Sequence, residues 1–328
     1  MLPHRHHHGY DFNRNYADYE WTERMTIAIT GASGLLGRAT AEFVLQIVNP
    51  SEVVLTTRTP GALADFSARG VEVRLADFAR PNTLGAAFAG VDRLLLVSTD
   101  AIGARLESQR AAVAAAEQAG VRHVVYTSVP EPFPGNPALV VADHAGTEEA
   151  LRASGLAWTA LRNNLYAHMQ VPGIEHAAAA GQFVTNAGTG VTAFVTREDC
   201  AAVAAAVLTQ DGHEGVAYDV TGPQALGAVD LAALAGELGG RGVELVDVDD
   251  EAFLAGLLQA GLPEEVAALV TSFGAATREG HLANVTSVVA DLTGRRPTAL
   301  SDVVRSTLKV GAGSQMGSPI YRPEVRAR

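Results

Sequence analysis

The stretch TIAITGASGLLGRAT, residues 26–40, decides the fold of this chain. It places a β-branched apolar run before three glycines and an alanine-rich run after them. Gly31, Gly34 and Gly37 stand three residues apart, a spacing that allows a tight turn and a close approach of the backbone to a ligand. A strand, a glycine-rich turn and a helix in this order predict a loop whose backbone N–H groups hold a phosphate at the helix N-terminus.

Short apolar runs alternate with longer alanine-rich segments after this turn. The runs that we predict to be strands are rich in β-branched residues and occupy residues 26–30, 52–57, 71–76, 93–98, 123–128 and 157–162. The segments between them predict helices, and one of these, residues 105–120, ends on Gly120 as helices commonly do. Such alternation is typical of right-handed βαβ units, so we expect a doubly wound, parallel α/β sheet of the Rossmann type.

This pattern divides the chain into four parts. Residues 25–162 carry the regular alternation and form the expected Rossmann domain, to which later segments can return. Residues 163–310 are expected to form a smaller C-terminal α/β domain for the substrate, in which residues 181–196 predict two short strands around a Gly/Asn turn. Residues 1–24 hold four histidines near their start but no apolar period, which favours a loose extension over a metal site. Residues 311–328 predict a loose tail.

Composition restricts the partners of the chain. With 328 residues, 48% of them hydrophobic, it can bury a core, and its formal charge of -12 opposes binding to nucleic acid. No apolar run is long enough to span a membrane and no secretory signal is present, so we expect a cytoplasmic protein without a membrane partner, monomeric or homodimeric. The single cysteine, Cys200, excludes an intramolecular disulfide, and we predict that it packs in a helix and that no metal is bound.

The residues at the end of the second predicted strand and just after it indicate which dinucleotide the glycine turn holds. Dinucleotide-binding folds that prefer NAD carry an Asp or Glu there, which binds the ribose hydroxyl. This chain has Thr57, Arg58 and Thr59 instead. A guanidinium beside the adenosine 2′-phosphate forms a charge-assisted hydrogen bond, so we predict NADPH as the cofactor. A purely surface role for Arg58 is the alternative.

The glycine string TGASGLLG resembles that of the extended and atypical short-chain dehydrogenases. The usual members of that class activate a carbonyl with a Tyr, a Lys four residues further on and a nearby Ser. Ser128 takes the Ser position, and counting back from Glu148 puts Val140 at the Tyr position and His144 at the Lys position. Lys309 is the only lysine of the chain, so no small shift of register restores the pair. The resemblance therefore implies chemistry without the proton donor that an ordinary ketone needs.

Several longer strings narrow this resemblance. Together, ITGASGLLGRA, RLLLVSTD, VVYTSV, DHAGTEEALRASGLAWTALRNNLY and LTGRRPTAL resemble the NmrA-like atypical short-chain dehydrogenases, most closely the bacterial branch of NADPH-dependent quinone oxidoreductases. The similarity extends over about residues 25–309 and includes the His in place of Lys. It implies reduction of a quinone, whereas other relatives bind dinucleotide as regulators without turnover. The N-terminal extension and the string RNNLY depart from the branch.

The resemblance also assigns residues to the site. It implies cofactor contacts from Gly31, Ser33, Gly34, Leu35, Leu36, Gly37, Arg58, Asp77, Phe78, Ser98, Thr99, Thr127, Ser128 and His144. The ligand of an open α/β sheet lies beyond the carboxyl ends of the strands, where Asn163 and Tyr166 also fall. We expect Asn163 to donate a hydrogen bond to a substrate oxygen and Tyr166 to form an aromatic wall. His144 would contact the nicotinamide ribose or pass a proton to a reduced quinone. Asn163 as a helix cap and Tyr166 as a core residue are the alternatives.

Three functions are compatible with these residues. The first is an NADPH-dependent oxidoreductase that transfers a hydride to a quinone-like small molecule, with little or no acid catalysis by the protein. The second is a redox sensor that binds NADP(H) without turnover. The third is a reductase or isomerase of a specialised metabolite that uses His144 or Tyr166 as its acid.

Overall fold

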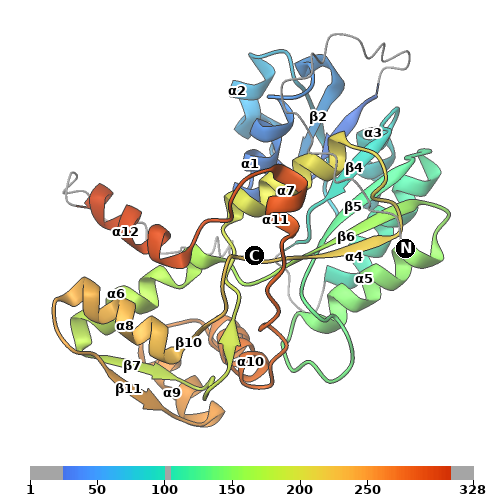
Figure 1. Ribbon diagram of the computed structural model, residues 1–328. Helices are drawn as coiled ribbons and strands as arrows, with labels where there is room; N and C mark the ends of the chain where they lie inside the picture. Colours follow the sequence, from blue (N-terminus) through green and yellow to red (C-terminus); the bar gives the residue numbers. More distant parts are fainter. Residues whose placement is uncertain (1–24, 100–104, 312–328) are drawn as a thin grey trace, which may run out of the picture.

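The structure, a computed structural model, describes residues 25–99 and 105–311. The predicted extension 1–24, and all but the first residue of the predicted tail 311–328, lie outside the described residues. The described part contains a large parallel sheet with helices on both faces, and a smaller region that lies below it and to the left in Figure 1.

Seven parallel strands form the large sheet, in the order β3-β2-β1-β4-β5-β6-β9. Their bounds are β1 Ile27–Ile29, β2 Val53–Thr57, β3 Glu72–Leu75, β4 Arg93–Leu96, β5 His123–Ser128, β6 Ala157–Asn163 and β9 Val216–Val220. The first six coincide with the predicted strands. The chain moves outward from β1 first in one direction and then in the other, which is the doubly wound arrangement. The predicted fold class is confirmed.

Both faces of this sheet are covered by helices. Successive side chains of a strand point to opposite faces, so Ile27 and Ile29 of β1 join one hydrophobic core and Ala28 joins the other. The helices of the first face are α1 Leu35–Val44, α2 Ala64–Ser67, α7 Arg197–Thr209 and α11 Val288–Thr293, and those of the second are α3 Leu84–Phe88, α4 Arg105–Gln118 and α5 Val141–Ala153. Burial on both faces explains why the central strands are apolar throughout.

Segments from the second half of the chain complete the large sheet. β9 pairs in parallel with β6, and α7 packs beside α1 on the first face. Cys200 of α7 is buried in this core, so the prediction that it packs in a helix is confirmed. The division into domains 25–162 and 163–310 remains a proposal, with α7, β9 and α11 returning to the large sheet.

The smaller region combines helices with two short sheets (Figure 1). Its helices are α6 Val171–Ala180, α8 Ala228–Gly239, α9 Asp250–Gln259, α10 Glu264–Arg278 and α12 Leu300–Gly311. β7, Gln182–Thr185, pairs in parallel with β11, Glu244–Asp247, and β8, Val191–Thr192, pairs antiparallel with β10, Leu226–Gly227. Both strands predicted in residues 181–196 therefore form, but each pairs with a strand further along the chain. Short 3-10 helices occupy connections at Pro50–Glu52, Pro60–Leu63, Pro81–Thr83 and Ala167–Met169.

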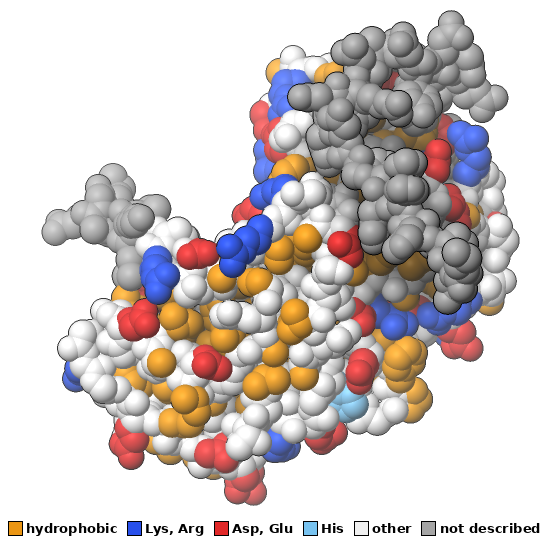
Figure 2. Space-filling view, viewed as in Figure 1, with side chains coloured by type: hydrophobic (Ala, Val, Ile, Leu, Met, Phe, Trp, Pro, Cys, Tyr) orange, Lys and Arg blue, Asp and Glu red, His pale blue; other side chains and the backbone are white. Residues whose placement is uncertain are grey.

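The surface of the smaller region is mixed in character. Figure 2 shows hydrophobic side chains gathered over the middle of this region, and acidic side chains along its lower rim. Apolar surface of this kind is common on folded proteins. Within residues 25–99 and 105–311, no helix is both long and apolar enough to cross a bilayer.

Candidate functional site at the carboxyl edge of the large sheet

The glycine turn connects β1 to α1 at the carboxyl edge of the large sheet. Gly31 has φ of +59°, a left-handed conformation that glycine adopts without strain, and the N–H of Gly34 donates to the Gly31 carbonyl oxygen at 2.9 Å. A Cβ on Gly37 would lie 2.6 Å from that same oxygen and 2.9 Å from the Ala32 Cα. Only glycine therefore allows α1 to begin this close to the turn.

The first turn of α1 has the character of an anion-binding site. Gly34 caps the helix without a side-chain hydrogen bond, and the first intrahelical bond runs from the Arg38 N–H to the Gly34 carbonyl at 2.9 Å. The amides of the residues before Arg38 have no partner within the helix, so they can donate to a phosphate. Ser33 and Leu35 are exposed here, and Ser33 Oγ lies 2.8 Å from Thr57 Oγ1 at the end of β2. The turn and the end of β2 thus form one surface.

Arg58 follows β2 on this surface. Its side chain is exposed, and among the described residues it forms no ion pair. Arg38, by contrast, pairs with Asp65 at 2.6 Å and donates to the Ala62 carbonyl. Of these two arginines, Arg58 is the one with a guanidinium free to bind a phosphate.

Asp77 and Phe78 follow β3 and differ in exposure. The N–H of Ala76 donates to the Thr57 carbonyl at 3.0 Å, which holds the ends of β2 and β3 together. Asp77 accepts from Arg80 Nε at 2.8 Å. The Phe78 side chain is buried in the second core, against α3, so any contact with an adenine involves its backbone or its edge.

Hydroxyl groups line the ends of β4 and β5. The Ser98 N–H donates to Thr127 Oγ1 at 2.8 Å, and Thr127 Oγ1 donates in turn to Ser98 Oγ at 3.2 Å. Thr99 Oγ1 is buried and has no partner in the described part of the chain. A buried polar atom without a partner is costly, so Thr99 fits a position that a ligand satisfies.

Ser128 belongs to a buried ionic cluster rather than to an open pocket. Its hydroxyl donates to Glu148 Oε1 at 2.7 Å, and the same carboxylate accepts from Arg152 at 2.6 Å and from Arg162 at 2.8 and 3.0 Å. Burial raises the pKa of Glu148, but hydrogen bonds from Arg162 and Ser128 outweigh it and hold this pKa below its ordinary value. The cluster ties β5, α5 and β6 together. Glu148 marked the register in the sequence, but nothing in the sequence indicated this role.

His144 lies in a second buried network. Its Nδ1 lies 2.8 Å from the Tyr126 hydroxyl, its Nε2 lies 3.2 Å from Arg105 Nη1, and Tyr126 donates to Gln109 at 3.1 Å. Burial, reinforced by the charge of Arg105, lowers the pKa of His144 to about 3. Arg105 can only donate, so Nε2 accepts and Nδ1 carries the proton toward Tyr126. His144 is thus neutral near pH 7 and its one proton is engaged. Its predicted contact with the cofactor remains a prediction.

Asn163 ends β6, and Tyr166 follows it. Asn163 is 7% exposed, and its Oδ1 has no hydrogen-bond partner among the described residues. Burial raises the pKa of the Tyr166 hydroxyl, and a hydrogen bond from Asn163 opposes this shift only in part. The carbonyl oxygen of Asn163 is therefore left for a ligand. Neighbouring Asn164 is structural, since its Nδ2 donates to the Leu282 carbonyl at 3.0 Å.

Arg197, the first residue of α7, borders this part of the site. Its guanidinium carbon lies 5.3 Å from the centre of the Tyr166 ring, and its Nη2 contacts Nε2 of His168. His168 in turn stacks on Tyr166 with ring centres 5.5 Å apart. Sequence reasoning missed Arg197, because only the tertiary structure brings the start of α7 beside the residues that follow β6.

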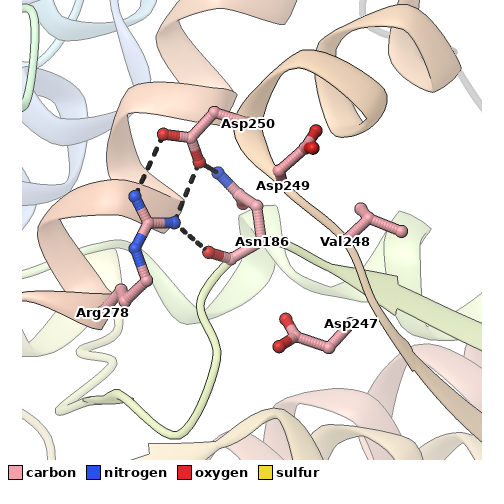
Figure 3. Close-up of a pocket in the computed structure, with 6 residues that line it drawn as sticks. All are labelled: Asn186, Asp247, Val248, Asp249, Asp250 and Arg278. Atoms are coloured by element: carbon pink, nitrogen blue, oxygen red, sulfur yellow. Dashed lines mark hydrogen bonds and ion pairs between the residues drawn. The ribbon is translucent and has the colours of Figure 1, made fainter.

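A separate surface hollow lies in the smaller region. It measures about 420 Å³ and is lined by Asn186, Asp247, Val248, Asp249, Asp250 and Arg278, at the carboxyl ends of β7 and β11 (Figure 3). Asp250 and Arg278 face each other and form two hydrogen bonds, at 2.9 and 3.0 Å. Asn186 donates to the same carboxylate at 2.7 Å. The Asn186, Asp250 and Arg278 side chains satisfy one another and join α9 and α10 to the loop after β7. The hollow is therefore not the candidate site.

The described residues include no group of three or more His, Cys, Asp or Glu side chains placed to hold a metal ion. The groups collected at the carboxyl edge are instead backbone amides, hydroxyls, an amide side chain and arginines. Such groups suit phosphates, riboses and a carboxamide. The edge from the glycine turn to Asn163 therefore fits a nicotinamide dinucleotide.

Comparison with known proteins agrees with this geometry. Residues 31–211 match the family described as NAD(P)H-binding. Quinone oxidoreductase 2 of Escherichia coli (strain K12) is 33% identical over 87% of this chain and 99% of its own length. An NAD(P)H azoreductase of Xenophilus azovorans is 28% identical over 85% of this chain and 97% of its own length.

Comparison with solved structures finds the same class of protein. The crystal structure of the NADPH-dependent quinone oxidoreductase of Escherichia coli, complexed with NADPH, has a TM-score of 0.83 and 33% identity, and covers 86% of this chain and 100% of that one. The chain is thus an NAD(P)H-binding oxidoreductase of the doubly wound α/β class. It belongs to the NAD(P)H-binding family, and the NmrA-like resemblance and the predicted nicotinamide cofactor are confirmed.

Proposed function

We propose that this chain is an NADPH-dependent oxidoreductase that reduces quinone-like acceptors without a Tyr–Lys pair. The observation that carries the proposal is the environment of the two replaced positions. Val140 is buried in an apolar cluster with Ala276 and Leu282, and both ring nitrogens of His144 are engaged. The relatives named quinone oxidoreductase and azoreductase act on acceptors that accept electrons readily, which supports the same class here.

The chemistry that this site supports needs little from the protein beyond binding and orientation. NADPH, when bound, supplies a hydride, which carries two electrons and one proton. A quinone that receives a hydride needs one further proton to become a hydroquinone, and solvent can provide it because the hydroquinone anion is a good acceptor of protons. The glycine turn and Arg58 would hold the phosphates, while Asn163 and Tyr166 would orient the acceptor and exclude water.

Burial disfavours acid catalysis by His144 or Tyr166. The pKa of His144 is lowered to about 3 by burial and by Arg105, and burial raises the pKa of the Tyr166 hydroxyl. Neither group therefore has a pKa near neutrality, where general acids work best. The same observation leaves the redox sensor as the second candidate, because a site without an acid can bind NADP(H) and transfer nothing to an ordinary carbonyl.

Oxidation of NADPH by the purified full chain tests the proposal. Benzoquinone, naphthoquinone and a panel of ketones serve as acceptors, with NADPH binding measured in parallel by calorimetry. We expect turnover with the quinones and none with the ketones. Tight NADPH binding without turnover on any acceptor would select the sensor, and turnover on ketones alone that Tyr166→Phe abolishes would select the reductase of a specialised metabolite.

Location and assembly complete the proposal. We infer a cytoplasmic protein, monomeric or homodimeric, that acts on a small molecule and does not bind nucleic acid. The formal charge of -12 supports the last point, since a nucleic-acid surface needs a basic face. Light scattering of the purified chain measures the assembly state, and retention on heparin at low salt would contradict the charge argument.

A further inference from the structure

Arg197 differs from the other poorly exposed arginines of the described chain in its partners. The side chain of Arg162 is 13% exposed and pairs with Glu148, and that of Arg93 is 11% exposed and pairs with Asp211. Arg197 is half-buried, yet no carboxylate in the described residues lies within ion-pair distance of it. Its guanidinium contacts the Tyr166 ring and the imidazole of His168.

Neither neighbour neutralises this charge. Burial, followed by the charge of Arg197, lowers the pKa of His168 to about 4, so the imidazole is neutral near pH 7 and accepts a hydrogen bond from the guanidinium. Burial also lowers the pKa of Arg197, although Tyr166, Glu198 and Cys200 oppose this shift. The pKa of Arg162, in contrast, is raised, because Arg162 donates hydrogen bonds to the Glu148 carboxylate. A half-buried cation held by neutral groups is stabilised by any anion that reaches it.

The position of Arg197 puts this cation at the candidate site. α7 is the helix directly before β9, which is parallel to β6, and it packs beside α1 on the sheet. It therefore begins at the carboxyl edge, where α1 also begins. The Ala167 N–H donates to the Val195 carbonyl at 2.8 Å, which brings the start of α7 next to the segment that follows β6. Asn163 Oδ1, buried and without a partner in the described chain, lies at the end of β6, directly before that segment.

We propose that Arg197, oriented by His168 and Tyr166, is an anion-binding subsite of this reductase site. The group bound is a carboxylate, a sulfonate or a phosphate, for which a guanidinium is well shaped. Two sources provide that chemistry at this edge: an anionic substituent on the acceptor, and a phosphate of the dinucleotide. The inference rests on the proposed function for the first source but not for the second, because cofactor binding can be measured without turnover.

The experiment compares Arg197→Gln with Arg197→Lys, which keeps the charge, and with Arg110→Gln as a control. Arg110 is exposed on α4, on the other face of the sheet, so this control removes the same charge from a distant surface. Three quantities are measured for each variant: kcat/KM with naphthoquinone, kcat/KM with naphthoquinone sulfonate, and the Kd of NADPH. Thermal unfolding shows which variants are folded, and Arg197→Lys carries the test where Arg197→Gln does not fold.

If Arg197 binds an anionic substituent of the acceptor, Arg197→Gln should lower kcat/KM for the sulfonate about tenfold or more relative to the neutral quinone. If Arg197 binds a phosphate of the dinucleotide, the Kd of NADPH should rise about tenfold or more, and kcat/KM should fall by the same factor for both acceptors. Arg197→Lys keeps the charge but not the planar guanidinium, so it should show a smaller loss of the same kind. Arg110→Gln should show neither loss. The inference would be overturned if Arg197→Gln left the Kd of NADPH unchanged and changed kcat/KM by the same factor for both acceptors. Absence of quinone reduction by the wild-type chain would overturn the proposed function instead, and the NADPH measurement would still test Arg197.

Discussion

The glycine turn and the Ser128–Glu148 cluster both lie at the carboxyl edge of one sheet, but different kinds of atoms build them. The turn is made of backbone: Gly31, Gly34 and Gly37 matter because they lack a Cβ. The cluster is made of side chains: one buried carboxylate is shared by a hydroxyl and two guanidinium groups. A turn built from backbone depends on residue spacing along the chain, whereas a buried ionic cluster depends on which strands and helices become neighbours. The first can be predicted from sequence and the second cannot.

The largest effect should come from breaking the buried cluster. Glu148→Gln keeps the shape of the side chain but leaves Arg162 without its buried counter-charge, and breaking such a pair costs about 3–5 kcal/mol. We expect a loss of this size in the free energy of unfolding, measured with urea. Glu149→Gln on the same helix is the matched control, because Glu149 is exposed, and it should change stability by less than about 0.5 kcal/mol. Equal small effects for both variants would show that the cluster contributes little.

The second test concerns pH and the His144 network. The folded pKa of His144 is about 3, below the ordinary value of 6.5. Above pH 6.5 neither state is protonated, and as the pH falls from there toward 3 the unfolded chain takes up a proton that the folded chain does not. Stability should therefore fall by about 1.4 kcal/mol per pH unit for each such histidine. His123 and His168, with pKa values of about 4, act in the same direction.

His144→Gln separates this contribution from the others. Glutamine keeps a donor and an acceptor near Tyr126 but does not titrate, so the slope of unfolding free energy against pH below 6.5 should become smaller. Unfolding by urea at a series of pH values measures the slope. A slope identical to that of the wild-type chain would mean that His144 becomes protonated in the folded state.

The third test breaks the glycine turn. Gly37→Ala places a Cβ 2.6 Å from the Gly31 carbonyl oxygen, so the turn must shift, at a cost of about 1–3 kcal/mol. NADPH binding should weaken at least tenfold, because the amides at the start of α1 no longer point at one place. Calorimetric titration measures this loss. Gly85→Ala in α3, where a Cβ meets nothing within 4 Å, is the control and should leave binding unchanged.

The smallest effect should come from Arg58, the exposed side chain that we predict to set the cofactor preference. Arg58→Ala removes a guanidinium but no buried contact, so stability should change by less than about 0.5 kcal/mol. A lost charge-assisted hydrogen bond of about 1.5–3 kcal/mol should weaken NADPH binding tenfold or more and leave NADH binding nearly unchanged. Titrations with both dinucleotides test this assignment. Equal losses for NADPH and NADH would contradict it.

Much of the fold could be predicted because local patterns report it. The six predicted strands form, and the sheet is parallel, because both faces of each strand had to be apolar to be buried under helices. The strands in residues 181–196 form as well, but their partners β10 and β11 lie more than thirty residues further along the chain. Pairing at that distance is decided by how the whole region packs, which no local pattern shows.

The sequence alone determined the glycine turn, the doubly wound sheet, the nicotinamide cofactor and the loss of the Tyr–Lys pair. These depend on spacing and residue type within one segment, and each follows from what a backbone or a missing side chain permits. Tertiary structure alone decided that His144 is neutral, that Ser128 is held by Glu148, and that Arg197 lies over Tyr166 with no described carboxylate paired to it. Charge, burial and hydrogen bonding depend on which groups are neighbours in space, and folding brings those groups together from distant parts of the chain.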